Sequence, residues 1–338
     1  MFTIDFDYFL PKELIAQSPL EPRDQARLLI MDKKDGSLSH KLFRNILDYV
    51  TPNDVLVVNN TKVLPARLLG VRRDTGGKAE VFVLRNTNGN DWEAQVKTSG
   101  KIHAGEIIDF GLAGTARYIE KLRNGLSIVR LSSKHVLQKH GIMPLPPYIK
   151  EKLEISDRYQ TVYAKHLGSA AAPTAGLHFT HELLKNVKDL GVSVVEVTLH
   201  VGVDTFRPVH EENPENHEIH KEYWHLSDFS ADTINNTKRK GGRVICVGTT
   251  TVRLLEHAAS VTCGSPLVAG SGMADLYILP GFSFKVTDAM ITNFHLPQST
   301  LLMLVSAFVT REHIMTAYRE AIDKKYRFYS FGDAMFIC

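Results

Sequence analysis

Several polar segments of this chain, spread between Asn59 and Asp333, are interrupted by glycine or threonine and contain residue types that bind anions or transfer protons. Small residues let a ligand approach backbone amides, and histidine can take up or release a proton near neutral pH. The most pronounced of these segments are 171–179, 200–209, 217–222, 244–256 and 291–300. Together they predict an enzyme whose active site is assembled from several loops.

Two of these segments lead into predicted helices. In AAPTAGLHF, small-residue turns and His178 precede a helix for which Thr180 is the expected N-cap. In VICVGTTTVRLLE, a buried strand passes through Gly248 into a helix that begins with threonines, which predicts a seat for a carboxylate or phosphate. The alternatives are an ordinary tight connection with a solvated His178, and simple N-capping by Thr249 or Thr250.

Histidines recur in two neighbouring segments. His200 follows a β-branched strand, so it is predicted at the carboxyl end of that strand, where open α/β sheets bind ligands. His217 and His220 are three residues apart and would share one face of a helix, and with His200 or Glu222 they could hold a metal. Because the chain has neither an HExxH helix nor a CxxC pair, polar or substrate-binding histidines are the favoured interpretation.

The C-terminal part contributes two more candidates. Asn293, His295 and Gln298 stand immediately before an apolar helix predicted over 300–309, with Ser299 as a possible N-cap. Asp333 interrupts an alternating, strand-like segment, and it is either a turn former or a carboxylate of the site.

The elements that must position these loops follow two patterns. Strand-like and helix-like runs alternate in most of the chain, which predicts an α/β layer. Between residues 66 and 144, six short alternating runs are separated by turn clusters such as DTGG and NTNGND. The sequence therefore predicts a mixed α/β main body, residues 1–65 and 145–338, with an inserted antiparallel β-barrel domain at 66–144. The glycine-rich GSGMAD is no Rossmann fingerprint, because it precedes the strand predicted at 275–279 instead of following one.

Composition limits the class of protein. With 338 residues, 43% of them hydrophobic and 23% charged, the chain is expected to form about two globular domains. No apolar run reaches the length of a membrane span, and the first residues lack the pattern of a signal peptide, so a soluble, cytoplasmic protein is expected. Three widely spaced cysteines fit a reducing compartment, and a net charge of +3 permits a polyanionic partner without requiring one.

Taken in order, the motifs resemble one family, the S-adenosylmethionine:tRNA ribosyltransferase-isomerases of queuosine biosynthesis. The similarity extends from DYFLPKELIAQSPLEPRDQARLL to YRFYSFGDAMFI, and APTAGLHFT and TNFHLP are its most specific parts. The resemblance implies an α/β body with an inserted barrel. It also implies transfer and isomerisation of the ribosyl part of S-adenosylmethionine onto 7-aminomethyl-7-deazaguanine at the tRNA wobble position. The products would be epoxyqueuosine in tRNA, adenine and methionine. S-adenosylmethionine is then a consumed substrate, no metal is needed, and a monomer is expected.

The resemblance also suggests roles for particular residues. His178 or His200 would be the general base, His217 and His220 would move protons or contact substrate, and Asn293 with His295 would bind adenine or the deazaguanine. The Gly248-Thr249-Thr250 turn with Arg253 would hold the methionine carboxylate or a phosphate. The remaining substrate-binding candidates are Pro173, Thr174, Gly176, Phe179, Gly202, Thr205, Phe206, Glu222 and Asp333. Basic candidates for the tRNA backbone, for which plain solvated surface is the alternative, are Arg72, Arg73, Lys78, Lys238, Arg239, Lys240 and Arg243.

Two positions depart from the pattern associated with the family: Val203-Asp204, and the loop 97–105, which is poor in lysine and proline. Two other functions stay open on the residues alone. One is a metal-dependent hydrolase built on His200, His217 and His220, and the other is a non-catalytic RNA-binding module that uses the barrel. As polar loop residues, His178 and His295 are expected to contribute to turnover and little to thermal stability.

Overall fold

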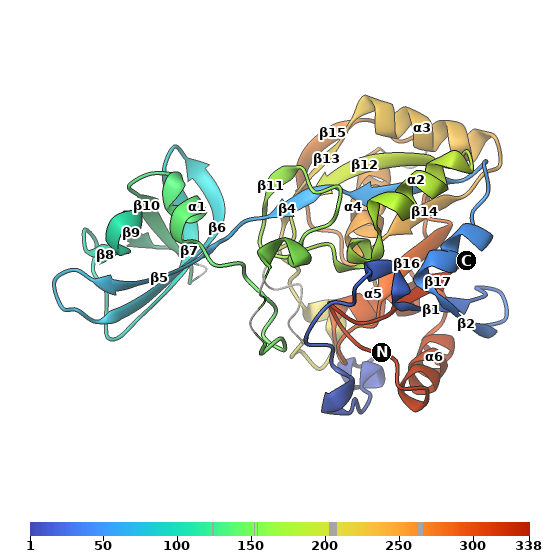
Figure 1. Cartoon of the computed structure of the whole chain (residues 1–338), viewed down its shortest axis with the longest axis horizontal. Helices are drawn as coiled ribbons and strands as arrows, with labels where there is room; N and C mark the ends of the chain where they lie inside the picture. The colour runs from blue at the N-terminus through green and yellow to red at the C-terminus, as the bar shows by residue number, and fades with distance from the viewer. Residues whose placement is uncertain (124, 152, 154, 203–207, 263–265) are drawn as a thin grey trace. The chain divides into compact units, whose positions relative to one another are not determined.

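The computed structural model describes residues 1–123, 125–151, 153, 155–202, 208–262 and 266–338. Its contacts divide the chain into two compact units (Figure 1). The main unit comprises Met1–Lys62, Pro146–His166 and Ala172–Cys338, and the barrel unit comprises Val63–Leu145 and Leu167–Ala171. The predicted division into folding domains, 1–65 with 145–338 and 66–144, concerns independent folding and stays a prediction.

The main unit is built on a nine-stranded mixed sheet with the order β15-β13-β12-β3-β14-β16-β17-β1-β2. The four strands β12, β3, β14 and β16 are parallel neighbours, with Ser193 beside Val55, Val244 beside Val55, and Ile245 beside Ala289. Their carboxyl ends therefore meet at one edge of the sheet, where the loops that follow them can form a site. The strands are β1 (Arg27–Met31), β2 (Leu38–Leu42), β3 (Val55–Asn59), β12 (Ser193–Leu199), β13 (Glu222–Leu226), β14 (Val244–Val247), β15 (Gly270–Ala274), β16 (Ala289–Asn293) and β17 (Ala334–Ile337).

The central strands are buried along their whole length because helices cover the sheet. β3 (VLVVN) and β14 (VICV) have no exposed residue, as expected for strands with both faces covered. Leu183 and Val187 of α2 pack in one core cluster with Leu56 and Val58 of β3, whereas α3 and α4 contact strands β3, β12 and β14. The predicted N-caps Thr180 and Ser299 are confirmed by side-chain hydrogen bonds. The helices are α2 (His181–Asp189), α3 (Asp228–Arg239), α4 (Thr249–Val261), α5 (Thr300–Phe308) and α6 (Arg311–Asp323).

The barrel unit is a closed six-stranded barrel with the order β10-β7-β6-β5-β8-β9, in which every neighbouring pair is antiparallel. All six strands predicted from the hairpin pattern are present, and side chains such as Leu68, Val81 and Val129 fill the interior. The unit also contains a short helix, α1 (His135–His140), which the strand pattern did not predict. The strands are β5 (Arg67–Arg72), β6 (Lys78–Asn88), β7 (Asp91–Thr98), β8 (Ile107–Asp109), β9 (Thr115–Lys121) and β10 (Ser127–Leu131). A mixed α/β body with an inserted antiparallel barrel is thus confirmed.

β4 (Thr61–Val63) and β11 (His166–Ser169) pair with each other where the chain passes between the two units. Within the described part of the chain, no helix combines the length and apolar character that a bilayer span requires.

One predicted strand is wrong. Residues 275–279 lie outside any strand, and the strand is instead the glycine-containing Gly270–Ala274, which pairs with β13. The physical reason is Trp224, whose ring lies over this strand. A Cβ atom on Gly270 or Gly272 would meet the ring at 3.3 or 3.4 Å, so glycine permits the close approach.

Candidate active site

A pocket of about 500 Å³ lies at the carboxyl ends of β12, β14 and β16, within the main unit. Four of the segments singled out in the sequence contribute to it, together with the start of α5 and the turn before β17. The pocket is lined by Tyr148, Ala172, Pro173, Thr174, Ala175, Val201, Gly248, Thr249, Thr250, Thr292, Asn293, Phe294, His295, Leu296, Leu301, Tyr329 and Ser330. The mixture of apolar walls with a few polar groups is typical of a small-molecule site.

The amino end of α4 forms one wall of this pocket. Gly248 is the N-cap, with φ of 90° and ψ of 151°, a conformation that only glycine adopts without strain. No side chain caps the helix, so the alternative of N-capping by Thr249 or Thr250 is wrong. Thr250 Oγ1 instead accepts a hydrogen bond from Asn59 Nδ2 at 3.3 Å. The amide of Thr251 donates to the carbonyl of Gly248 at 3.1 Å, which leaves the amides of Thr249 and Thr250 to an anion in the pocket.

Asn293 presents a hydrogen-bond acceptor to the pocket. Its Nδ2 donates to the carbonyl of Tyr329 at 2.9 Å, which fixes the amide, and its buried Oδ1 has no partner among the described residues. Tyr329 has φ of 70°, and its ring lies 4.7 Å from that of Tyr148. The Asn293 side chain is also close enough to His178 to raise the pKa of that histidine as a hydrogen-bond partner. An amide anchored in this way is suited to accept an N–H group, from His178 or from a ligand.

His295 lines the same pocket and is 7% exposed. Its Nε2 lies 2.7 Å from Thr292 Oγ1, and its backbone is held by the hydroxyls of Tyr8 and Tyr318. Burial lowers the pKa of His295 to about 3. The ring is therefore neutral at physiological pH and can accept a proton or a hydrogen bond.

His200 stands at the carboxyl end of β12, as predicted, directly before the pocket residue Val201. Thr61 Oγ1 lies 2.7 Å from His200 Nδ1, and the ring stacks on Tyr223 at 5.4 Å. Burial and the charge of His166 lower the pKa of His200 to about 4. With Nδ1 engaged by Thr61, Nε2 is the nitrogen left for a substrate.

A buried ion pair supports the chain after His200. Glu222 and Arg253 are 4% and 5% exposed, and Arg253 Nη1 bonds Glu222 Oε2. The other carboxylate oxygen of Glu222 accepts the amide of Gly202 at 2.7 Å. None of the three is among the pocket-lining residues, so Arg253 acts on the loop through Glu222. Thr205 and Phe206, with Asp204, lie outside the described residues.

His178 is placed differently from His200 and His295. It is 4% exposed, stacks on Phe43 at 4.8 Å, and lines a second pocket beside the first. Its neighbour Phe179 packs edge-on against Phe43 in the core, and Gly176 is pressed against Tyr163, whose hydroxyl would lie 2.1 Å from a Cβ. The solvated-histidine alternative is therefore wrong, because the segment is a 3-10 turn, η7 (Thr174–His178), buried under the sheet.

His217, His220 and Asp333 are not among the described residues that line the pocket. Residues 217–220 are not helical, so the premise that His217 and His220 share a helical face is wrong. His217 Nδ1 pairs with Glu211 at 2.9 Å. Asp333 accepts the amide of Arg327 at 2.8 Å within its own turn, and it binds β1 through the amide of Arg27 at 2.8 Å and an ion pair with the Arg27 side chain at 3.2 Å. Among the described residues, no group of three or more histidine, cysteine or acidic side chains is close enough to hold a metal.

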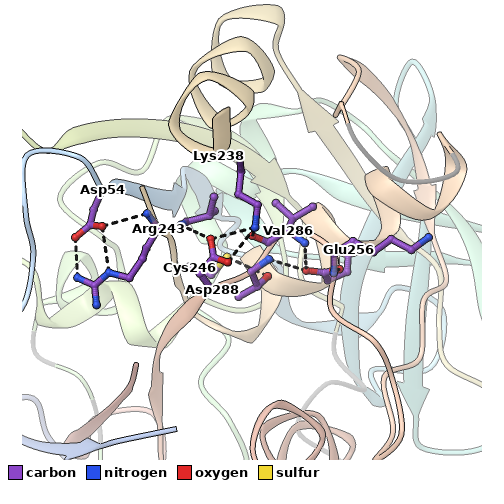
Figure 2. Close-up of polar contacts among 10 residues, drawn as sticks. Asp54, Lys238, Arg243, Cys246, Glu256, Val286 and Asp288 are labelled. Atoms are coloured by element: carbon purple, nitrogen blue, oxygen red, sulfur yellow. Dashed lines mark hydrogen bonds and ion pairs between the residues drawn. The ribbon is translucent and has the colours of Figure 1, made fainter. Parts of the chain in front are cut away.

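Several basic candidates for tRNA are engaged by carboxylates. Figure 2 shows Lys238 on Asp288 and Arg243 on Asp54, with nitrogen–oxygen distances of 2.9 and 2.7 Å. These acids stand just before β3 and β16, so the pairs lie at the amino ends of the parallel strands, opposite the pocket. In the barrel unit, Arg72 and Arg73 pair with Glu106 and Asp109. Lys78, Arg239 and Lys240 make no ion pair with the described residues.

The sequence did not predict Thr61, Tyr148, Tyr329 or Ser330. A signal for Thr61 existed, since the polar run NNT directly follows a fully buried strand. Tyr148 ends a proline-rich stretch that is typical of a linker, and its contact with Ser330, 2.7 Å between hydroxyl oxygens, joins residues 182 positions apart. No local pattern predicts such a contact.

Comparison with known proteins shows the family. A family model described as "Queuosine biosynthesis protein" matches residues 3–337. S-adenosylmethionine:tRNA ribosyltransferase-isomerases of two Staphylococcus epidermidis strains are each 52% identical, over 98% of this chain and 98% of their own length. The crystal structure of S-adenosylmethionine tRNA ribosyltransferase from Thermotoga maritima is 34% identical, with a TM-score of 0.56, over 99% of this chain and 100% of that chain. The chain therefore belongs to the S-adenosylmethionine:tRNA ribosyltransferase-isomerase family of queuosine biosynthesis proteins.

Proposed function

We propose that this chain transfers and isomerises the ribosyl moiety of S-adenosylmethionine onto 7-aminomethyl-7-deazaguanine at the tRNA wobble position. The products are epoxyqueuosine in tRNA, adenine and methionine. Family membership supports the reaction. The observation that carries the assignment to a site is the pocket in which the amino end of α4, Asn293 and His295 meet. It offers an anion seat, a purine contact and a neutral histidine together.

The chemistry determines what the site must supply. The sulfonium of S-adenosylmethionine acidifies the neighbouring C5′ of the sugar, so a base can remove that proton. Loss of adenine and rearrangement then leave an electrophilic fragment for the aminomethyl group of the tRNA base. The reaction needs a base, a proton for the departing adenine and a clamp for the methionine carboxylate.

We assign His200 as the general base, in preference to His178. His200 is directly followed by a pocket residue and keeps Nε2 for a substrate, whereas His178 lines the other pocket. Thr61 orients the ring, as a partner on one imidazole nitrogen fixes the role of the other.

Asn293 and His295 hold a purine in this proposal. The unused Oδ1 of Asn293 can accept the exocyclic amine of adenine or of the deazaguanine. The carboxylate of the methionine part lies at the first-turn amides of α4, beside Thr249 and Thr250. Arg253 positions the loop through Glu222 and does not touch the carboxylate.

Of the basic candidates without an ion pair among the described residues, Lys78 is the one we propose for the tRNA backbone, since a cation already paired with a carboxylate loses that contact on binding phosphate. Arg239 bonds Asn236, and it lies with Lys240 at the end of α3, at the edge of the sheet opposite the pocket. The enzyme acts as a monomer in the cytoplasm, and sedimentation at working concentration tests the first part. His217 and His220 keep the proposed role in proton movement or substrate contact.

Product analysis tests the function. We expect S-adenosylmethionine and tRNA that bears the aminomethyl-deazaguanine to give adenine and methionine in equal amounts, with the ribose-derived fragment gained by the tRNA. tRNA with guanine at that position is the control and should be inert, because it lacks the nucleophilic amine. Formation of S-adenosylhomocysteine as the main product, which indicates methyl transfer, would refute the proposal, as would tRNA whose mass is unchanged.

A further inference from the structure

The pocket that contains His178 is distinct from the pocket described above, although Ser330 lines both. It has a volume of about 290 Å³. Besides Ser330 and His178, its polar side chains are Arg23 and Arg158, and no acidic residue is among the described residues that line it. Arg327 lies close enough to His178 to affect its titration. All these residues belong to the main unit.

Hydrogen-bond donors of this cluster are buried without partners. The unpartnered atoms, judged over the residues that the structure describes, include His178 Nε2, Arg158 Nε and Arg327 Nη1. A buried donor without a partner costs about 1–3 kcal/mol, and more if it is charged. The Asn293 side chain lies close enough to His178 to act as its hydrogen-bond partner, and Arg327 is near the pocket without lining it. Arg158 Nε is therefore the lining donor for which a ligand atom would supply the missing hydrogen bond.

The arginines are held in place by the protein. Arg23 donates to the carbonyls of Gln160 and Asp157, at 2.7 and 3.1 Å, and Arg158 donates to the carbonyl of Leu20 at 2.6 Å. Glu21, which is 69% exposed, forms an ion pair with Arg158, and an anion in the pocket would share Arg158 with this carboxylate. The guanidinium groups are thus fixed before any ligand arrives, and pre-organised forks of this kind match the geometry of oxyanions.

The charges that act on His178 are positive, whereas Asp157 acts on Arg23 and Asp333 on Arg327. Burial is the main cause that lowers the pKa of His178 to about 4, Asn293 opposes the shift, and the charges of Arg327 and Arg23 lower it further. Burial also lowers the pKa values of Arg23 and Arg327. An anion bound here would stabilise these cations, whose burial costs solvation free energy. His178 would be neutral and could donate one hydrogen bond to the anion.

We propose that this second pocket is an oxyanion subsite, formed by Arg23, Arg158 and His178, that binds a phosphodiester of the tRNA next to the reacting nucleotide. The proposal rests on the proposed function for the identity of the ligand. An oxyanion of the other substrate, the methionine carboxylate, has the same chemistry. The phosphodiester is favoured because the amino end of α4 already offers the carboxylate a seat in the first pocket.

The test compares Arg158→Gln with Arg319→Gln, an equal loss of charge. Arg319 is exposed on α6 and bonds only within its own helix, to Met315 and Thr316. The measurements are equilibrium Kd values for the tRNA substrate over a range of salt concentrations, and for S-adenosylmethionine alone. Arg158→Lys, which keeps the charge but loses the fork, is the second variant in case the glutamine variant fails to fold.

We expect Arg158→Gln to raise the Kd for tRNA about 10- to 100-fold, the loss of one charge-assisted contact. The slope of log Kd against log salt should fall by about one. Arg158→Lys should raise the Kd less and keep the salt slope, and Arg319→Gln should change neither substrate's binding.

Each other result has one meaning. A weakened S-adenosylmethionine complex with unchanged tRNA binding would keep the oxyanion subsite and assign it to the carboxylate. Unchanged binding of both substrates in a folded variant would overturn the subsite, as would an equal effect of Arg319→Gln. Because binding is measured without turnover, failure of the proposed reaction would appear separately, as missing adenine and methionine with the wild-type enzyme.

Discussion

Three histidines of the main unit share one electrostatic property, which is that their surroundings keep them uncharged. Burial is the largest cause for each, and the pKa falls to about 4 for His178, about 4 for His200 and about 3 for His295. A neutral imidazole can accept a proton from a substrate, whereas an imidazolium cannot. Burial therefore keeps these rings neutral and able to accept a hydrogen bond, but it also disfavours their protonated form, so a base such as His200 would need its imidazolium stabilised by the bound substrate.

This coupling predicts an acid-sensitive stability. Below pH 6.5, His178 and His295 are protonated in the unfolded state but stay neutral in the folded state. The free energy of unfolding therefore decreases as the pH falls from 6.5 towards their folded pKa values. At pH 5, each of these two histidines lowers the free energy of unfolding by about 2 kcal/mol. Trp92→Phe leaves Trp224 as the reporter of the main unit in urea titrations at pH 8 and 5.

In the Trp92→Phe background, His295→Gln and His178→Gln should each reduce the difference in unfolding free energy between pH 8 and pH 5 by about 2 kcal/mol. His181→Gln, at an exposed position on α2, is the control and should leave the difference unchanged. Both buried substitutions should also lower stability at pH 8. The sequence predicts that these two residues, as loop residues, contribute little to thermal stability. The structure predicts a loss of stability instead, because both side chains are buried. An equal pH dependence in all variants would contradict this account.

A second prediction concerns metals. The histidines lack a closed ligand set among the described residues, and His217 is paired with Glu211. We therefore expect turnover to survive prolonged EDTA treatment followed by buffer exchange. Activity that disappears and returns with one equivalent of zinc would instead favour a metal-dependent enzyme.

The connection from β14 to α4 is the element on which the anion seat depends. Gly248 turns the chain so that the helix begins at the pocket, and its amide donates to the carbonyl of Ile291 at 2.8 Å. A Cβ here would be 3.6 Å from the nearest atom, so space is sufficient and the constraint is the positive φ. Strain at this turn would shift the first-turn amides to which we assign the methionine carboxylate.

We predict that Gly248→Ala lowers the free energy of unfolding by about 1–3 kcal/mol and raises the Kd for S-adenosylmethionine at least several-fold. Gly241→Ala is the matched control, with φ of 73° and no atom within 4 Å of the Cβ position. It should lose stability but bind S-adenosylmethionine normally, as calorimetry would show. Normal binding by folded Gly248→Ala would remove α4 from the carboxylate site.

At the scale of the whole molecule, the two units have separate hydrophobic cores. The barrel core comprises residues between Leu64 and Leu137, and the main core contains none of them. Each unit also contains one of the two tryptophans, Trp92 in the barrel unit and Trp224 in the main unit. These facts support the proposed division into domains at 66–144 and the remainder.

We therefore predict that replacing residues 66–144 by a short glycine-serine linker leaves the cooperative unfolding of the main unit intact, followed by Trp224 fluorescence. Residues 66–144 alone should keep Trp92 buried, because the barrel closes without strands from the main unit. A main unit that loses its cooperative transition, or a barrel that exposes Trp92, would show that the two units fold as one domain.

The sequence by itself determined the features that depend on neighbours along the chain. The alternating runs and turn clusters of the barrel predicted its six strands, because a hairpin is specified by its own turn and period. The caps Thr180 and Ser299 and the place of His200 after a β-branched strand follow from the same local rules. The resemblance of the motifs to one family was equally visible without coordinates.

Only the tertiary structure decided which of these segments meet. The order β12-β3-β14-β16 pairs strands that are far apart in sequence, and their register brings Asn293 and the amino end of α4 to one pocket. It also buries His178 in a different pocket and places Tyr148 beside Tyr329. Burial, pKa and pocket membership are sums over long-range contacts, and a local pattern contains no information about partners more than a hundred residues away.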